Sequence, residues 1–296
     1  MTSNKTSLLI MAAGMGSRYG GLKQLDPVGP NGELLIHYTL YDAHLSGFNK
    51  AVFVIRKEFE DEFRDMISKF IPPQMETVYA YQEMSDLPEG RKKPWGTGHA
   101  VLVCKDLISE PFGVVNADDF YGRRSFKALN DFLKSGQCGK NRYSMVGYLL
   151  KNTVSLHGGV TRGVSKVSDS WLVTIDETSG IEVRDGKIGV EKNGAWIEID
   201  PMTFVSMNFW GFDPYIFEDI ESQFSQFLDA KKDDPKSEFL IPDVVATLVE
   251  NGSAKVKVID TDEVWFGMTH PEDREIVMGE IEKMITDGVY PKNLRD

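Results

Sequence analysis

The chain has 296 residues, of which 41% are hydrophobic and 26% charged, so we expect a globular protein with one large core or two closely fused lobes. Its 33 basic and 45 acidic side chains give a formal charge of -12, which excludes the long basic face that a nucleic-acid-binding protein needs. The two cysteines, Cys104 and Cys138, are too few for a disulfide framework and lack a metal-type spacing, so we expect reduced thiols in a cytoplasmic protein.

No stretch of the sequence approaches the roughly 20 apolar residues of a membrane span. The apolar run 8–13 is too short for a secretory signal, and glycines and Arg18 follow it. We therefore expect a soluble, untargeted protein with neither a membrane nor a nucleic acid among its partners.

Short apolar runs rich in β-branched residues alternate with amphipathic segments through the first half of the chain. The expected strands are 8–12, 51–55, 77–81, 112–117 and 145–150. The expected helices are 36–45, which ends before Gly47, 58–70, and a third that starts near Ser125 as N-cap. This alternation predicts parallel strands joined by crossover helices.

From about residue 155 the sequence changes to short strands that are separated by glycine turns. The dipeptides Asp185-Gly186 and Asn193-Gly194 are typical hairpin turns, so they predict an antiparallel insertion that covers part of the sheet. The expected later elements are a strand at 205–212, helices at 214–228 and 242–252, a strand at 255–260, and a last helix from Pro271 to about Asp287.

The glycine-rich turn AAGMGSRYGGLKQ (12–24) directly follows the first expected strand. Glycines let backbone N–H groups approach a phosphate closely, while Arg18 supplies a fixed fork and Lys23 a point charge. A dinucleotide fingerprint would need a glycine at Tyr19, and a P-loop would need Ser or Thr at Gln24. A phosphate cradle and a plain structural turn both stay open on this pattern alone.

Two more polar segments follow expected strands. Gln82 precedes PWGTGHAV (94–101) and can offer a donor and an acceptor to a base edge, while Gly96 permits close backbone approach. In VVNADDFYG (114–122), Asp118 can begin a Mg²⁺ site. Asp119 could assist it or cap the next turn, and we favour the cap. Because the carboxyl ends of parallel strands line one crevice, these segments and the glycine turn should converge.

The residues AAGMGSR followed by LKQL resemble the signature loop of the sugar-1-phosphate nucleotidyltransferases, with Leu22 where that family often has proline. The resemblance implies a nucleotide-diphospho-sugar transferase fold, which is a Rossmann-like, doubly wound α/β fold with a mainly parallel mixed sheet and an antiparallel sugar-binding insertion. It also implies a single domain over 1–296, with a nucleotide-binding half (1–155) and a sugar-phosphate-binding half (156–296).

The resemblance further implies the site residues. The catalytic residues would be Arg18, Lys23 and Asp118, and Asp118 would also be the magnesium ligand. Those of nucleotide binding would be Ala12, Ala13, Gly14, Gly16, Ser17, Gln82, Gly96 and Thr97. Those of sugar binding would be Gly163, Glu177 and Asn208.

The sequence departs from the family pattern at two positions. Phe266 and Gly267 stand where many members have a second metal ligand, and Thr178 stands where many have a lysine after the sugar-binding glutamate. The residues that could fill in are Lys187, Lys192, Arg162 and Asp262. For the basic residues 91–93 we favour a solvated loop over a triphosphate contact.

The expected activity is Mg²⁺-dependent transfer of a nucleotide from UTP or dTTP to a sugar 1-phosphate, which releases pyrophosphate. The partners would be a nucleoside triphosphate and a sugar phosphate, and a homo-oligomer is compatible with the sequence. Two alternatives stay open: a nucleotidyltransferase with a non-sugar phosphate acceptor, and a non-catalytic regulatory protein that binds nucleotides or sugar phosphates. An NAD-binding dehydrogenase is a remote third.

Overall fold

The computed structural model describes residues 5–14, 27–83, 87, 91, 93–155, 158–267 and 273–295. The first-half strands are β1 (Ser7–Met11), β2 (Lys50–Ile55), β3 (Glu76–Tyr81), β4 (Phe112–Asn116), β5 (Asp119–Phe120) and β6 (Arg142–Leu149). The second-half strands are β7 (Val160–Ser168), β8 (Trp171–Arg184), β9 (Lys187–Lys192), β10 (Ala195–Glu198), β11 (Phe204–Phe212), β12 (Lys255–Asp260) and β13 (Phe266–Gly267).

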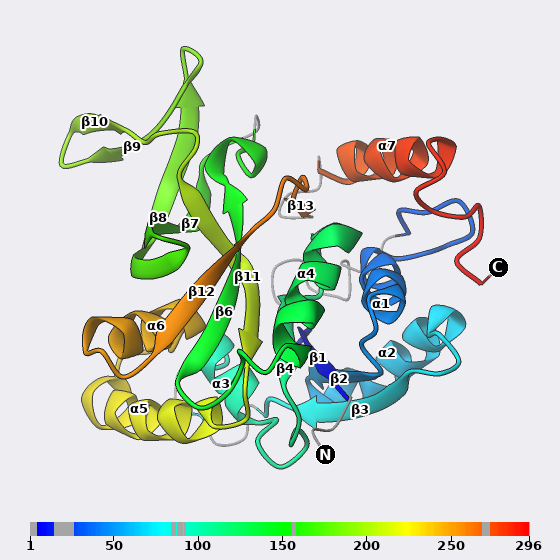
Figure 1. The fold of residues 1–296 in the computed structure, drawn as a ribbon, viewed down its shortest axis with the longest axis horizontal. Helices are drawn as coiled ribbons and strands as arrows, with labels where there is room; N and C mark the ends of the chain where they lie inside the picture. The colour runs from blue at the N-terminus through cyan, green and yellow to red at the C-terminus, as the bar shows by residue number, and fades with distance from the viewer. Residues whose placement is uncertain are drawn as a thin grey trace.

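Helices follow β1, β2, β3, β5 and β11 in the chain, and a last helix follows β13 (Figure 1). The α-helices are α1 (Leu35–Leu45), α2 (Glu60–Ile67), α3 (Thr97–Leu102), α4 (Arg123–Lys134), α5 (Ile216–Lys231), α6 (Ile241–Glu250) and α7 (Asp273–Thr286). None of the described helices is long and apolar enough to cross a membrane. Pro271, the expected start of the last helix, lies outside the described residues.

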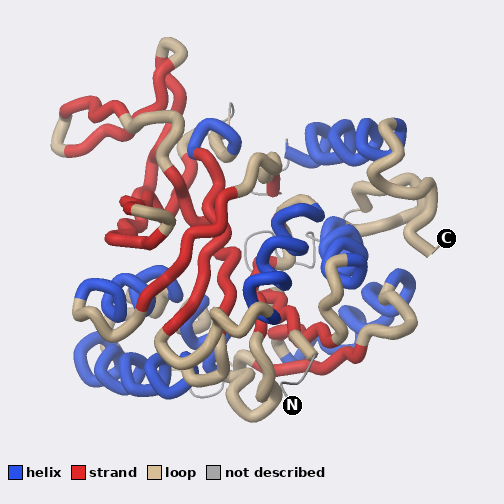
Figure 2. The backbone as a smooth tube through the Cα atoms, in the orientation of Figure 1, coloured by secondary structure: helices blue, strands red, loops and turns tan. Residues whose placement is uncertain are grey.

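The described strands other than β5 and β13 form one 11-stranded mixed sheet in the order β10-β9-β8-β12-β6-β11-β4-β1-β2-β3, with β7 paired to β11 and β8 (Figure 2). The strands β4, β1, β2 and β3 are parallel neighbours, as the alternation of strands and helices predicts. β11 then runs antiparallel between β4 and β6, and most pairings beyond it are antiparallel. The sheet is therefore α/β and mixed, with its parallel part confined mainly to the first half of the chain.

Both faces of the central strands are buried, which explains their unbroken apolar sequences. In β1, Leu8 and Ile10 pack into one cluster with α1, α2 and α4, while Leu9 packs into another with α3, α5 and α6. The alternation follows from the two-residue period of a strand. The result is three layers, helices on each side of one sheet, with strand ends free to carry functional side chains.

The predicted hairpins are confirmed. Asp185 and Asn193 each precede a glycine, and all four residues of the two turns have positive φ, between 51° and 76°. This is the backbone that a two-residue hairpin turn requires. The β8–β9 and β9–β10 pairs that they connect project from the body of the molecule (Figure 1).

The third predicted helix starts earlier than expected. α4 begins at Arg123, and Gly122, with φ of 80°, is its N-cap. Ser125 lies inside the helix, and its hydroxyl is buried against the Thr261 hydroxyl at 2.9 Å. The N-cap expectation for Ser125 is thus wrong, because a tertiary contact uses its hydroxyl.

Candidate active site

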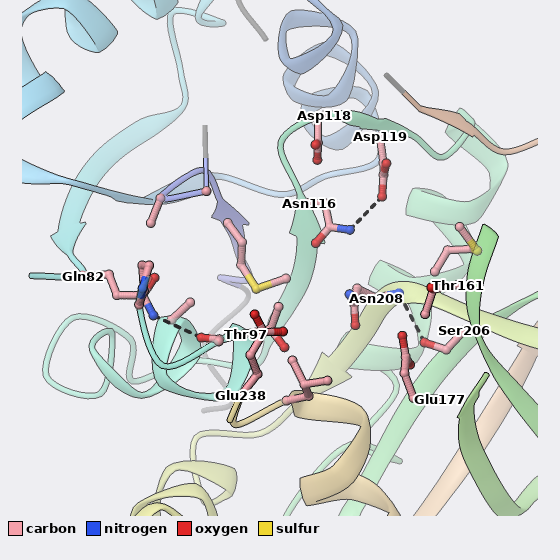
Figure 3. Close-up of a pocket in the computed structure, with 18 of the residues that line it drawn as sticks. Gln82, Thr97, Asn116, Asp118, Asp119, Thr161, Glu177, Ser206, Asn208 and Glu238 are labelled. Carbon is pink, nitrogen blue, oxygen red and sulfur yellow. Dashed lines mark hydrogen bonds between the residues drawn. The ribbon is translucent and has the colours of Figure 1, made fainter. Parts of the chain in front are cut away.

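A cavity of about 620 Å³ lies at the carboxyl ends of β1, β3 and β4 and extends to β7, β8 and β11 (Figure 3). The described residues that line it are Met11, Ala13, Gly14, Gln82, Lys93, Pro94, Gly96, Thr97, Ala100, Asn116, Asp118, Asp119, Thr161, Arg162, Glu177, Ser206, Met207, Asn208, Glu238, Leu240 and Trp265. Figure 3 shows Gln82 at one side, Glu177 with Thr161 and Ser206 at another, and Asp118 with Asp119 at a third.

Most of the predicted site residues that the structure describes are brought together here. Those that line the cavity are Ala13, Gly14, Gln82, Gly96, Thr97, Asp118, Glu177 and Asn208. Ala12 instead packs into the core, and Gly163 lies in the sheet, where an added Cβ would be 2.9 Å from the Ile175 side chain. Gly16, Ser17, Arg18 and Lys23 lie outside the described residues.

Gln82 is held by two hydrogen bonds that involve its amide nitrogen. Nε2 donates to the Gly96 carbonyl at 3.0 Å and faces Nδ1 of His99 at 3.1 Å. Because the Gly96 carbonyl can only accept, the NH₂ group must point towards it. Burial lowers the pKa of His99 to about 4, so the neutral ring accepts at Nδ1. Gln82 therefore offers a ligand its oxygen alone, rather than the donor and acceptor expected from the sequence.

The low pKa of His99 predicts a specific loss of stability in acid. The folded protein disfavours the charged ring, so this contribution to stability is present above pH 6.5 and is lost as the pH falls towards 4. His99→Asn keeps an acceptor for Gln82 without a titrating group. We expect its free energy of unfolding, measured by urea denaturation, to fall less between pH 6.5 and 4 than that of the wild type. An identical pH dependence in both proteins would contradict this role.

Gly96 and Thr97 tie the start of α3 to the segment before α6. Gly96 has φ of 109°, and a Cβ at this position would lie 2.7 Å from the Phe239 carbonyl oxygen. The Thr97 hydroxyl accepts a hydrogen bond from the Ile241 N–H at 3.0 Å. The close backbone approach that requires glycine is thus made by Phe239, and it fixes the wall of the cavity beside Gln82.

Asp119 does not cap the next turn, contrary to expectation. It is buried at the start of β5, and its Oδ2 accepts hydrogen bonds from Asn116 Nδ2 at 2.7 Å and from the Tyr121 hydroxyl at 3.1 Å. Burial and the adjacent Asp118 charge raise the pKa of Asp119 above its usual range. Two carboxylates with this mutual repulsion would gain from a shared cation.

The departure at Gly267 has a structural explanation. β13 pairs with β5 so that Gly267 is opposite Asp119, and a Cβ on Gly267 would lie 2.5 Å from Asp119 Oδ1. An acid from the neighbouring strand thus lies where a side chain at residue 267 would project.

The described residues contain no group of three or more His, Cys, Asp or Glu side chains that could hold a metal ion. Mg²⁺, however, commonly takes only one or two protein carboxylates and completes its coordination with water and substrate phosphates. Asp118 and Asp119, both on the cavity wall, therefore fit the protein's share of such a site.

The wall opposite Gln82 carries hydroxyl, amide and carboxylate groups. Asn208 has φ of 58°, at an irregularity where the register of β11 against β6 shifts, and its Oδ1 accepts a hydrogen bond from Trp210 Nε1 at 3.4 Å. Burial and then the charge of Asp243 raise the pKa of Glu177. With Thr161 and Ser206 beside them, these groups are suited to a ligand with several hydroxyls.

The solvated-loop interpretation of the basic residues 91–93 is wrong for Arg91. Its buried guanidinium donates to the carbonyls of Lys93, Pro94, Asp234 and Ser237, and it lies 3.9 Å from the Trp95 ring centroid. Lys93 lines the cavity, and Lys92 lies outside the described residues. Arg91 thus holds the loop in place, while Lys93 brings a cation to the site.

Several lining residues had no signal in the sequence, namely Asn116, Thr161, Ser206, Glu238 and Trp265. Lys93 belonged to the basic run 91–93, for which the sequence favoured a solvated loop. Of the four residues considered as replacements for the missing cation and metal ligand, Arg162 alone is a lining residue in the described part of the chain. Lys187 forms an ion pair with Glu198, and Asp262 with Arg124.

Comparison with known proteins gives the fold a precedent. No protein-family profile matches the sequence, and a search of curated proteins finds no match. Solved structures do match over nearly the whole chain. A UDP-glucose pyrophosphorylase in complex with UDP-glucose has a TM-score of 0.58 at 19% identity, over 94% of this chain and 99% of that one.

Two more structures match similarly. An inositol-1-phosphate CTP transferase from T. maritima has a TM-score of 0.59 at 15% identity, over 96% of this chain and 98% of that one. A putative glucose-1-phosphate thymidylyltransferase from Bacillus anthracis has a TM-score of 0.61 at 14% identity, over 93% and 94%. The chain therefore has the fold that is found in sugar-1-phosphate nucleotidyltransferases.

Proposed function

We propose that this protein is a nucleotidyltransferase that joins a nucleoside triphosphate to a sugar 1-phosphate and releases pyrophosphate. The observation that carries the proposal is that Gln82, Asp118 and Glu177, from three different segments, line one cavity in a fold shared with nucleotidyltransferases. Residues 1–155 would supply the nucleotide side and residues 156–296 the sugar-phosphate side.

The reaction is an in-line displacement. An oxygen of the acceptor phosphate attacks the α-phosphorus, a new P–O bond forms, and the bond to the β-phosphate oxygen breaks as pyrophosphate leaves. Because a phosphate monoester is already nucleophilic, the protein contributes positioning and charge compensation more than a general base. Mg²⁺ held by Asp118 and Asp119 would supply charge compensation on the α- and β-phosphate oxygens.

Each side of the cavity has a part in this chemistry. The Gln82 oxygen suits a base that presents an N–H, such as the N3–H of uracil or thymine, which supports UTP or dTTP. Arg18 and Lys23 would stabilise the departing pyrophosphate and the charge at the α-phosphate. Glu177 and Asn208 would bind the hydroxyls of the acceptor, while Gly14, Gly16 and neighbouring backbone would cradle the phosphates.

Pyrophosphate release from a panel of triphosphates and phosphorylated acceptors in the presence of Mg²⁺ tests the proposal. We expect turnover with UTP or dTTP together with a sugar 1-phosphate. Absence of pyrophosphate with every pair, despite nucleotide binding, would replace the proposal by the regulatory-protein alternative.

A second acceptor class has specific support. One structural match of comparable quality acts on inositol 1-phosphate, whose polyol is not a sugar, and the lysine expected after Glu177 is absent. Turnover with inositol or alcohol phosphates, and none with sugar 1-phosphates, would favour a non-sugar acceptor.

A further inference from the structure

The acceptor side of the cavity contains a buried guanidinium that forms no ion pair with any residue the structure describes. Arg162 on β7 is only 6% exposed and lines the cavity. It takes part in none of the ion pairs between residues that the structure describes. Burial lowers its pKa to about 10, so the side chain is still charged at neutral pH. A buried cation that no described carboxylate contacts within ion-pair distance is costly, so its free donors suit an anionic ligand.

The guanidinium is oriented but not saturated. Nη1 donates to the Thr161 carbonyl at 2.8 Å, Nη2 donates to the Thr153 carbonyl, and the centre of the group lies 4.5 Å from the Trp265 ring centroid. Nε–H has no hydrogen-bond partner among the described residues, and neither has the indole N–H of Trp265. Since a guanidinium has five N–H donors, three on Arg162 are left for a ligand.

The position of Arg162 lies between two parts of the proposed site. Asp119 and Glu177 are the acids whose charges act on it, one in the proposed magnesium site and the other on the hydroxyl-binding wall. An acceptor whose hydroxyls contact Glu177 and whose phosphate reaches the metal must place that phosphate between them. In the β7–β8 register Arg162 is directly opposite Thr178, so it also brings a cation to the place where the sequence lacks one.

We infer that Arg162 binds the phosphate group of the acceptor by a forked pair of hydrogen bonds. Trp265 and the two backbone carbonyls hold the guanidinium in the orientation for this. The acceptor class is therefore a phosphate monoester of a polyhydroxyl compound. This inference rests on the proposed function for the identity of the ligand, but the anion site itself can be tested without turnover.

The test is calorimetric titration of the full chain with inorganic phosphate. We expect Arg162→Gln to weaken phosphate binding by about 10- to 100-fold, the loss typical of a charged hydrogen-bonded pair, and to leave UTP binding unchanged. The matched control is Arg184→Gln, since Arg184 lies 4.6 Å from the Trp196 ring but outside the cavity. Phosphate binding that is absent in the wild type, or equal in wild type and Arg162→Gln, would overturn the inference.

Two further measurements keep the inference separate from folding and from the proposed function. If Arg162→Gln does not fold, the wild type can be followed by NMR, with the Nε–H resonance of Arg162 assigned by its absence from Arg162→Lys. We expect this resonance to shift when phosphate is added, and an unchanged resonance would overturn the inference. A phosphate site lost in Arg162→Gln without turnover by the wild type would contradict the proposed function alone. Turnover with an acceptor KM unchanged by Arg162→Gln would contradict the Arg162 inference alone.

Discussion

Replacing Asp118 by asparagine is expected to lower the rate of pyrophosphate release by about 10²- to 10³-fold, the usual cost of removing one preorganised charge-stabilising group. Asparagine keeps the size of the side chain but removes the charge that would hold Mg²⁺ at the end of β4. We also expect the Mg²⁺ concentration for half-maximal turnover to rise.

Stability should not follow activity in this variant. The Asp118 charge is one cause of the raised pKa of Asp119, so its removal relieves repulsion between two neighbouring acids. We expect the free energy of unfolding without Mg²⁺ to stay within about 0.5 kcal/mol of the wild type. The matched control is Asp131→Asn, an exposed acid on α4 that pairs only with Lys127 in the described part of the chain. Asp118→Asn activity above a tenth of the wild type would refute this role.

The sequence predicts the local features of this fold well, because they depend on nearby residues. The apolar runs of β1, β2 and β4 identify strands that are buried on both faces, and the Asp-Gly and Asn-Gly pairs identify hairpin turns. The convergence of Gln82 and Asp118 on one cavity also follows from a local rule, since both residues come after parallel strands.

Features that depend on distant pairing could not be predicted in the same way. β11 is inserted between β4 and β6, although its sequence is simply that of a buried strand. In the sequence Arg91 belongs to a charged surface run, yet its side chain is buried and donates hydrogen bonds to the carbonyls of Asp234 and Ser237. In both cases the partner lies far along the chain, so no short sequence window contains the information.

The acidic site shows the same limit most clearly. The sequence shows Gly267 as a lost ligand, and it favours Asp119 as a turn cap over a role beside the metal. The β5–β13 pairing brings them together and makes one the complement of the other. A glycine at one position and an acid at the other are therefore a single feature, visible only once the two strands are paired.

This pairing leads to a prediction about Asp119 and Gly267 together. Asp119→Ala is expected to raise the Mg²⁺ concentration for half-maximal turnover by about 10- to 100-fold, since it removes one of two proposed ligands. Gly267→Asp alone should cost about 1–3 kcal/mol of stability, because its Cβ would lie 2.5 Å from Asp119 Oδ1. In the double variant the added carboxylate enters the space that Asp119 has left.

The expected result of this double-mutant cycle is a change of sign. Gly267→Asp should impair Mg²⁺ binding in the wild type but improve it in Asp119→Ala. The improvement should be incomplete, because the Trp265 ring would lie 2.9 Å from the new Cβ. Electron paramagnetic resonance of added Mn²⁺ measures the affinity of each variant for a divalent cation without turnover. Gly279→Asp on α7, where an added Cβ meets nothing within 4 Å, is the matched control. If Gly267→Asp has the same effect in both backgrounds, the two carboxylates do not share one place in the site, and Asp119 is not the substitute for the missing ligand.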